Sequence, residues 1–393
     1  MAAFAINEQF PIGQKTIALV LSYMEEIEEK SLSIDTYKVK GRTVIDIRTA
    51  KQICGQSGYF VVISLDSNDK KALTRKMKGM GAATRTVVIG AKIIYRQVKS
   101  IMTVSGHVIE AKLRKQKVEK EISPVIDDFV LHTFHTADGR ELCYNLYKPK
   151  NDTKIGKMPL VLFMHDSSAC SDSPVAPLIQ GMGAYIWASP EEQAKRPCYV
   201  LVPSYPGKTA SDKFEVTWEC EATVELVGEL VKKENIDPGR IYGTGQSMGS
   251  MMLCELNIKH PELFAASYIV AGQWSPQRLT SIKNKNIWIM ISEKDEKAYP
   301  IMTEAMNMIE ESGGKVATGN IDAKASCEEK KKFAEEVLSQ KADIQFTYYI
   351  GKSVLADGVK EFPGCFHLST WQWAYDVEPI REWIFTKQIS FKK

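Results

Sequence analysis

The sequence lacks the features that mark several common protein classes. Its eight cysteines are scattered along 393 residues, and none forms a CxxC pair or a His/Cys cluster with zinc spacing. No run of about 18 apolar residues is present, so we expect no transmembrane helix. The first residues lack the basic start and apolar stretch of a signal peptide. The sequence therefore leaves open a cytoplasmic protein or a secreted one whose signal has been removed.

A strong charge of one sign is also missing. The formal net charge is only +3, so the composition does not call for a nucleic acid or a membrane as partner. No Walker loop and no zinc signature is present, so we expect neither a cofactor nor a metal. Hydrophobic residues make up 44% and charged residues 25% of the chain, which is typical of a globular protein. The length fits two domains.

Residues 1–126 are predicted to form an all-β accessory domain. Four stretches are rich in β-branched and apolar residues, and turn signals separate them: 15–23, 59–66, 85–96 and 107–114. No convincing long amphipathic helix interrupts them. Short strands at this spacing indicate a β-sandwich. The charged, proline-containing passage 117–129 is the predicted linker.

Residues 127–393 show strands alternating with helices. Near-continuous apolar runs at 158–166 and 198–204 are typical of strands buried on both faces. Further strands are expected at 129–134, 141–149, 240–246, 264–272, 286–295 and 344–351. Helices are expected at 221–234, 247–260, 299–313 and 370–385. This alternation predicts a mostly parallel sheet with helices on both faces.

The sharpest motif is Gly245-Gln246-Ser247-Met248-Gly249, which matches the G-x-S-x-G nucleophile elbow. It follows a predicted strand and opens a predicted helix, as the elbow requires. The glycines avoid clashes at the sharp turn, where the serine adopts strained backbone angles. Ser247 is therefore the expected nucleophile, placed where a helix N-terminus favours developing negative charge.

The general base follows by elimination among six histidines. The elbow fold requires the chain order Ser, acid, His, and only His260 and His367 follow Ser247. His260 ends the helix that carries the nucleophile and points away from its start. His367 follows the strand at 344–351, on the edge where strands end, so it is the expected base.

The acid is expected after the strand between serine and histidine. Asp295 follows the apolar run at 286–292, where a short carboxylate can accept from the imidazole N–H and fix its tautomer. Glu293 and Glu296 are close rivals, and Asp322 is a weaker one.

Two backbone N–H groups are expected to hold the oxyanion. The N–H of Met248, directly after the nucleophile, is the first. The second is expected from Asp166 or Ser167, in the loop after the strand at 158–164. His165, at the start of that loop, is interpreted as a structural histidine.

Aromatic residues near predicted strand ends are candidates for contact with substrate, because aromatic side chains often line apolar pockets. The candidates for substrate binding are Trp218, Trp274, Tyr205 and Phe366, together with Gln246 of the elbow. The alternative is that the aromatic side chains pack in the core.

Several stretches of the sequence resemble the esterases that carry an N-terminal immunoglobulin-like domain ahead of an α/β-hydrolase domain. Those esterases are relatives of polyhydroxybutyrate-depolymerase-like and feruloyl esterases, and distant relatives of prolyl oligopeptidases. The resemblance rests on residues 159–166, 199–206, 235–249, 260–266, 291–300 and 367–375. It places Ser247, Asp295 and His367 at the triad positions. The chain departs from the family pattern at Asp166 and Ser250, where glycine is usual.

The resemblance implies a serine carboxylic-ester hydrolase that works through an acyl-enzyme. Its expected substrates are small or polysaccharide-linked esters with aromatic, feruloyl-type acyl groups or short-to-medium ones. Two alternatives stay open: a peptidase of the prolyl-oligopeptidase type, although the β-domain is too short for a seven-bladed propeller, and a catalytically degenerate binding module. The sequence also leaves open a homo-oligomer.

Overall fold

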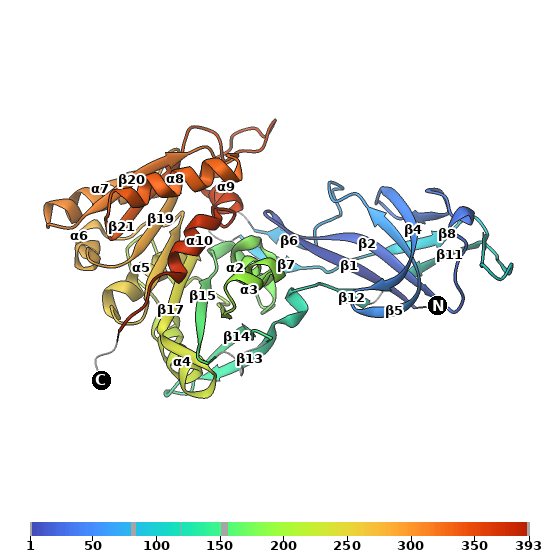
Figure 1. Cartoon of the computed structure of the whole chain (residues 1–393), viewed down its shortest axis with the longest axis horizontal. Coiled ribbons are helices and arrows are strands. Elements are labelled where there is room, and N and C mark those ends of the chain that lie inside the picture. Colours follow the sequence, from blue (N-terminus) through green and yellow to red (C-terminus); the bar gives the residue numbers. More distant parts are fainter. Residues whose placement is uncertain (1, 80–83, 119, 151–155, 391–393) are drawn as a thin grey trace. The chain divides into compact units, whose positions relative to one another are not determined.

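The computed structural model describes residues 2–79, 84–118, 120–150 and 156–390. By their contacts the residues form two compact units. The first comprises residues 1–76 and 87–128, and the second comprises residues 77–86 and 129–393. Figure 1 labels the elements of both.

The described part of the first unit is built from β-strands and short 3₁₀ turns. One sheet has five strands in the order β12-β1-β2-β5-β4, and a second has three in the order β11-β8-β3. The bounds of the strands are β1 Ala3–Phe10, β2 Gly13–Tyr23, β3 Tyr37–Val39, β4 Val44–Ile53, β5 Gln56–Leu65, β8 Ile94–Gln97, β9 Ile101–Met102, β10 Val108–Ile109, β11 Lys112–Lys117 and β12 Lys120–Ile122. The strands β9 and β10 form a separate hairpin.

The core of this unit lies between the two sheets. Leu19 and Val61 of the larger sheet share one buried cluster with Tyr37 and Tyr95 of the smaller one. Side chains from two facing sheets that fill one core define a sandwich, so the prediction of a β-sandwich is confirmed. The predicted strand 85–96 is wrong in one respect, because the chain leaves the β-region at Gly90, where φ is +65°.

Three other expectations for this unit need correction. The expected strand at 107–114 is divided into β10 and β11, and β1 and β4 were not expected at all. The predicted linker contains β12, which pairs in parallel with β1 and extends the larger sheet. Strand β4 has no clear sequence signal, because its residues are exposed or half-buried and leave no clean hydrophobic alternation.

The second unit holds a nine-stranded sheet within the described residues, in the order β13-β14-β16-β15-β17-β18-β19-β21-β20. From β16 onward in this order, all neighbouring strands are parallel. The bounds are β13 Val130–His135, β14 Glu141–Tyr147, β15 Met158–Met164, β16 Tyr199–Ser204, β17 Ile236–Gln246, β18 Ala266–Val270, β19 Ile287–Ser292, β20 Val316–Ile321 and β21 Ile344–Tyr349.

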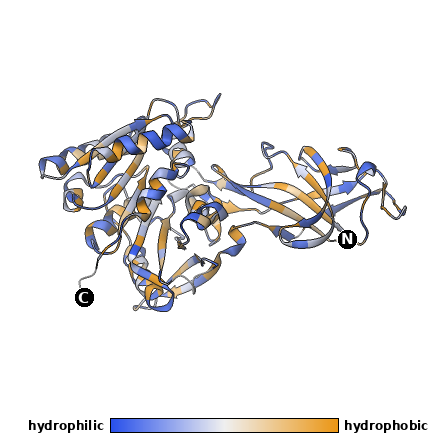
Figure 2. Cartoon of the chain, in the orientation of Figure 1, coloured by the Kyte–Doolittle hydropathy of each residue, from blue (hydrophilic) through white to orange (hydrophobic). Residues whose placement is uncertain are grey.

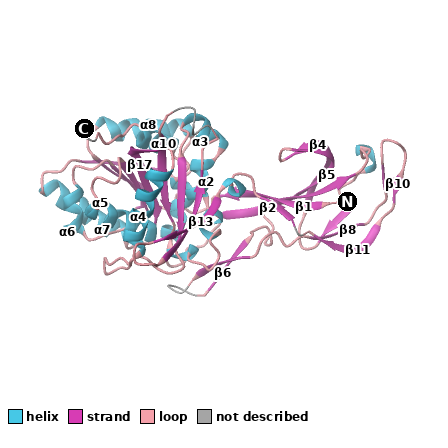
Figure 3. Cartoon of the chain, turned by 90° about the horizontal axis from the view of Figure 1, so that it is seen from below, coloured by secondary structure: helices cyan, strands magenta, loops and turns pink. Residues whose placement is uncertain are grey.

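Helices cover both faces of this sheet, as Figure 3 shows. Helices α4, α5 and α7 contact one face, and α2, α9 and α10 contact the other. The bounds are α1 Ala176–Ile179, α2 Met182–Ala188, α3 Pro190–Lys195, α4 Glu219–Lys233, α5 Met248–Lys259, α6 Pro276–Leu279, α7 Ala298–Glu311, α8 Cys327–Ser339, α9 Cys365–Ala374 and α10 Glu378–Phe385. Figure 2 shows the hydrophobic residues along the strands, and all seven residues of β15 are buried. The predicted parallel sheet between helix layers is confirmed.

The helix predicted at 370–385 is instead two helices, α9 and α10. Pro379 stands in the first turn of α10, where its missing N–H costs nothing, but inside one continuous helix it would break the hydrogen-bond ladder.

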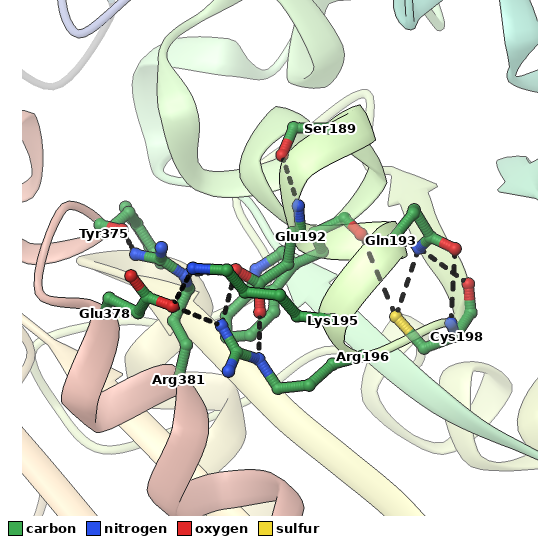
Figure 4. Close-up of polar contacts among 10 residues, drawn as sticks. Ser189, Glu192, Gln193, Lys195, Arg196, Cys198, Tyr375, Glu378 and Arg381 are labelled. Carbon is green, nitrogen blue, oxygen red and sulfur yellow. Dashed lines mark hydrogen bonds and ion pairs between the residues drawn. The ribbon is translucent and has the colours of Figure 1, made fainter.

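A buried ion cluster ties α3 to α10. Glu192 is 2% exposed and binds two arginines, at 2.5 Å to Arg196 Nε and 2.9 Å to Arg381 Nε. Arg381 also donates to the carbonyl of Tyr375, at the end of α9. Figure 4 shows Glu192 between the two guanidinium groups. The cluster therefore fixes the C-terminal helices against the rest of the unit.

We predict that Glu192→Ala lowers the free energy of unfolding by about 3–5 kcal/mol, because it leaves the buried Arg381 without its carboxylate partner and Arg196 with Glu378 alone. The matched change Glu229→Ala removes an exposed pair with Lys233 and should cost less than about 1 kcal/mol. Denaturant unfolding measures both values. A loss below about 1 kcal/mol for Glu192→Ala would show that the cluster adds no stability.

Candidate active site

Ser247 lies at the turn between β17 and α5. Its φ is 51° and its ψ is −117°, a conformation that a non-glycine residue rarely adopts. The space around this turn explains the flanking glycines. A Cβ on Gly245 would lie 2.6 Å from the backbone of Gly249, and a Cβ on Gly249 would overlap the carbonyl of Met164. The motif is therefore required by the close approach of helix α5 to strand β15.

Ser247, His367 and Asp295 form one chain of hydrogen bonds. Ser247 Oγ lies 2.8 Å from His367 Nε2, and His367 Nδ1 lies 2.6 Å from Asp295 Oδ2. The carboxylate can only accept, so Nδ1 carries the proton and Nε2 is free to accept from the serine hydroxyl. The residues come from three elements: the start of α5, the turn after β19 and the first turn of α9.

Asp295 is 3% exposed and uses both carboxylate oxygens. Oδ2 faces the histidine, while Oδ1 accepts from the N–H groups of Lys297 and Ala298. Asp295 thus caps helix α7 as well as orienting the imidazole. Burial alone raises the pKa of Asp295, but the hydrogen bond and charge of His367, with the two backbone N–H groups, outweigh it and hold the pKa below its ordinary value.

Asp295 is the acidic residue that bonds to His367, and the other candidates make different contacts. Glu293 accepts from the N–H of Gly351, and Glu296 is exposed on the cleft wall. Asp322 accepts from the N–H of Lys324. His260 bonds to Glu221 at 2.9 Å, at the far end of α5. One expectation needs correction: His367 lies within α9 and not on the loop before it.

The loop after β15 forms a single 3₁₀ turn, η4, at Ser167–Ala169. Asp166 precedes this turn and caps it, since its Oδ1 accepts from the N–H of Ser168 at 2.7 Å. The other oxygen, Oδ2, accepts from Nε2 of Gln246 at 2.9 Å. Both oxygens of the unusual carboxylate are therefore engaged inside the protein. Ser167 lines the cleft together with Ser247, whereas Asp166 does not.

His165 supports the same loop from within the core. It is fully buried, and burial lowers the pKa of its imidazole below the ordinary value despite the nearby Asp166. Nδ1 donates to the carbonyl of Asp166 at 2.8 Å, and Nε2 accepts from the N–H of Tyr205 at 3.0 Å. The interpretation of His165 as a structural histidine agrees with these contacts.

A cleft of about 910 Å³ opens at Ser247 and His367. Its apolar lining includes Val216, Met251 and Phe362, and the Phe362 ring is 51% exposed. Charged side chains also line it, and Lys297 pairs with Asp212 at its wall. The lining is therefore mixed, and a cleft of this volume is typical of a small-molecule site.

Of the five side chains expected to contact substrate, Phe366 lines this cleft. The other four do not line it. Trp274 is fully buried and donates to Glu255 at 3.0 Å, while Tyr205 is fully buried against Thr223. Trp218 stacks on Arg140 at 4.5 Å, and Gln246 is buried on Asp166. A place near a strand end does not fix where a side chain points.

Two lining residues were missed that a sequence signal could have found. Met251 stands four positions after Ser247 on α5, on the same helix face. Phe362 precedes Pro363-Gly364, a turn signal directly before the helix of the histidine. Among the described residues, no cluster of His, Cys, Asp and Glu could hold a metal ion, and no helix could cross a membrane.

Comparison with known proteins agrees with this architecture. Residues 2–110 match the family model of the esterase Ig-like N-terminal domain. A crystal structure of a thermostable esterase is 24% identical, with a TM-score of 0.79, covering 99% of this chain and 100% of that one. A search of curated protein sequences found no significant match.

Other solved structures have lower sequence identity and lower TM-scores. A feruloyl esterase module from Clostridium thermocellum, with sinapinate, is 12% identical over 67% of this chain and 90% of its own, at a TM-score of 0.43. An acylaminoacyl peptidase from Pyrococcus horikoshii is 11% identical over 84% of this chain and 58% of its own, at 0.45. The fold of the chain, an immunoglobulin-like domain followed by an α/β-hydrolase domain, rests on its strand order, the family match and the likeness to the thermostable esterase. Its N-terminal part matches the esterase Ig-like family over residues 2–110.

Proposed function

We propose that this protein is a serine carboxylesterase. The observation that carries the proposal is the unbroken chain of hydrogen bonds from Ser247 Oγ through His367 to Asp295, at a cleft of about 910 Å³. A hydroxyl becomes an effective nucleophile when a neutral imidazole accepts its proton and a buried carboxylate stabilises the imidazolium that forms. The esterase match of the N-terminal residues supports acyl esters as the substrate class.

Acylation follows from this geometry. His367 Nε2 takes the hydroxyl proton while Ser247 Oγ forms a bond to the acyl carbon, and the carbonyl electron pair moves to oxygen. The N–H of Met248 is the first of α5 and has no partner within the helix, so it faces the developing charge. We assign Ser167 N–H, at the start of η4, as the second donor. The C–O bond to the alcohol then breaks, and His367 protonates the alcohol as it leaves.

Deacylation repeats the same steps with water. His367 Nε2 takes a proton from a water molecule, whose oxygen bonds to the acyl carbon of the ester on Ser247. The intermediate collapses, the bond to Ser247 Oγ breaks, and the proton returns to the serine. The products are the carboxylic acid and the free enzyme.

The lining of the cleft favours an acyl group larger than acetyl. Val216, Met251, Phe362 and Phe366 give it apolar surface near the nucleophile, and the half-exposed Phe362 ring is available to pack on an acyl chain or an aromatic ring. We therefore propose medium-length or aromatic, feruloyl-type esters as preferred substrates.

The triad makes a direct prediction. Ser247→Ala should lower kcat for p-nitrophenyl butyrate by about 10⁶-fold, and Asp295→Asn by about 10⁴-fold, because the second change keeps the shape but loses the tautomer control. Steady-state kinetics measure both effects. The control Ser281→Ala removes an exposed hydroxyl on the carbonyl of Arg278 and should leave kcat unchanged.

A fluorophosphonate probe separates the alternatives. It should label Ser247 in the wild-type protein and not in Ser247→Ala. A folded wild-type protein without label or ester turnover would identify a degenerate binding module. Faster cleavage of a proline-containing peptide than of any ester would favour a peptidase.

A second prediction concerns acyl preference. Phe362→Ala should lower kcat/KM for p-nitrophenyl octanoate and methyl ferulate about fivefold, and that for p-nitrophenyl acetate less than twofold, because only larger acyl groups reach the ring. Turnover of acetyl esters alone, or an unchanged kcat/KM for the octanoate in the variant, would contradict the proposed acyl class.

A further inference from the structure

A short hairpin of the N-terminal part of the sequence belongs, by its contacts, to the second unit. Strands β6 (Arg75–Lys78) and β7 (Arg85–Val88) pair with each other, and residues 77–86 group with the α/β domain. We call residues 77–79 and 84–86 the hairpin arm. Its described residues contact the turn η4, which carries the proposed oxyanion donor Ser167, and the neighbouring loop at Pro206.

Two side chains of the hairpin arm bind backbone carbonyls of these loops. Thr86 is 2% exposed, and its Oγ1 donates to the carbonyl of Ser168 at 2.9 Å. Arg85 Nη1 donates to the carbonyl of Pro206 at 3.2 Å. Ser168 is the middle residue of η4. Pro206 lies two residues before Lys208, which lines the cleft.

The two loops also bind each other. Cys170 Sγ donates to the carbonyl of Gly207 at 3.0 Å. The η4 turn is a single turn of three residues, so no long helix fixes its orientation. Its position is held by a few contacts: the Asp166 cap, the bonds of His165 and Cys170 beside it, and the Thr86 hydroxyl.

We propose that Thr86 is a positioning residue for the oxyanion donor Ser167, with Arg85 steadying the neighbouring loop. The inference rests on the proposed esterase function. The hydroxyl of Thr86 holds the Ser168 carbonyl, one residue beyond Ser167, and thereby fixes the turn in which the Ser167 N–H is presented to the cleft.

The chemistry explains why such a contact affects the chemical step. An oxyanion donor acts when it lies about 2.7–3.1 Å from the oxygen that becomes charged, and it contributes mostly in the transition state. A turn that drifts by a fraction of an ångström weakens this bond while the ester still binds in the cleft. Loss of the Thr86 hydroxyl should therefore lower kcat and spare KM.

The test compares Thr86→Val, which keeps the shape and loses the donor, with Thr86→Ser, which keeps the donor. On p-nitrophenyl butyrate, Thr86→Val should lower kcat about tenfold with KM within twofold, and Thr86→Ser should retain kcat. Binding of a trifluoromethyl ketone, a transition-state analogue, should weaken by the same factor as kcat. A purely structural role would lower the melting temperature without this parallel loss.

Arg85→Met provides a second variant, because Arg85 is exposed and its loss does not threaten the core. It should lower kcat about threefold, whereas the charge-matched control Lys78→Met, exposed on β6, should have no effect. If Thr86→Val does not fold, Arg85→Met decides alone.

Unchanged kcat in a folded Thr86→Val, or in Arg85→Met where that variant decides, would overturn the proposal. Failure of the esterase function itself is recognised separately, by a wild-type protein that neither hydrolyses esters nor takes the fluorophosphonate label.

Discussion

The close approach of helix α5 to strand β15 is the constraint on which the site depends. The chain must turn from β17 into α5 within one residue, and only glycines at 245 and 249 leave room for that crossing. Ser247 then takes a strained conformation, and its hydroxyl lies within hydrogen-bond distance of His367. Its backbone N–H bonds to the carbonyl of Val270 at 3.0 Å, so the neighbouring strand holds the strained residue in place.

The remaining groups converge because parallel strands end at the same edge of a sheet. The carboxylate follows β19, and the imidazole follows β21 through the loop that leads to α9. Asp295 divides its two oxygens between helix α7 and the imidazole, so the same contacts that stabilise the local fold also select the histidine tautomer. The buried cluster at Glu192 holds the carbonyl at the end of α9 and so supports the helix that carries His367.

Much of this could be predicted from the sequence, and the failures have physical causes. The elbow, the chain order and the parallel sheet have strong local signals in glycines and apolar runs. Side-chain direction has no such local signal. Trp274 is therefore a core residue, while Phe362, on an exposed loop before α9, lines the cleft. The contact of Thr86 with Ser168 spans 82 residues, and no pattern near either residue announces it. Strand β4 was missed because exposed residues interrupt its alternation.

A crystal structure of the protein after reaction with diethyl p-nitrophenyl phosphate tests most directly whether Ser247 is the nucleophile. We expect phosphorus bonded to Ser247 Oγ, with the phosphoryl oxygen within about 3.1 Å of the backbone nitrogens of Met248 and Ser167. Phosphorus on another side chain, or a phosphoryl oxygen turned away from both nitrogens, would contradict this expectation.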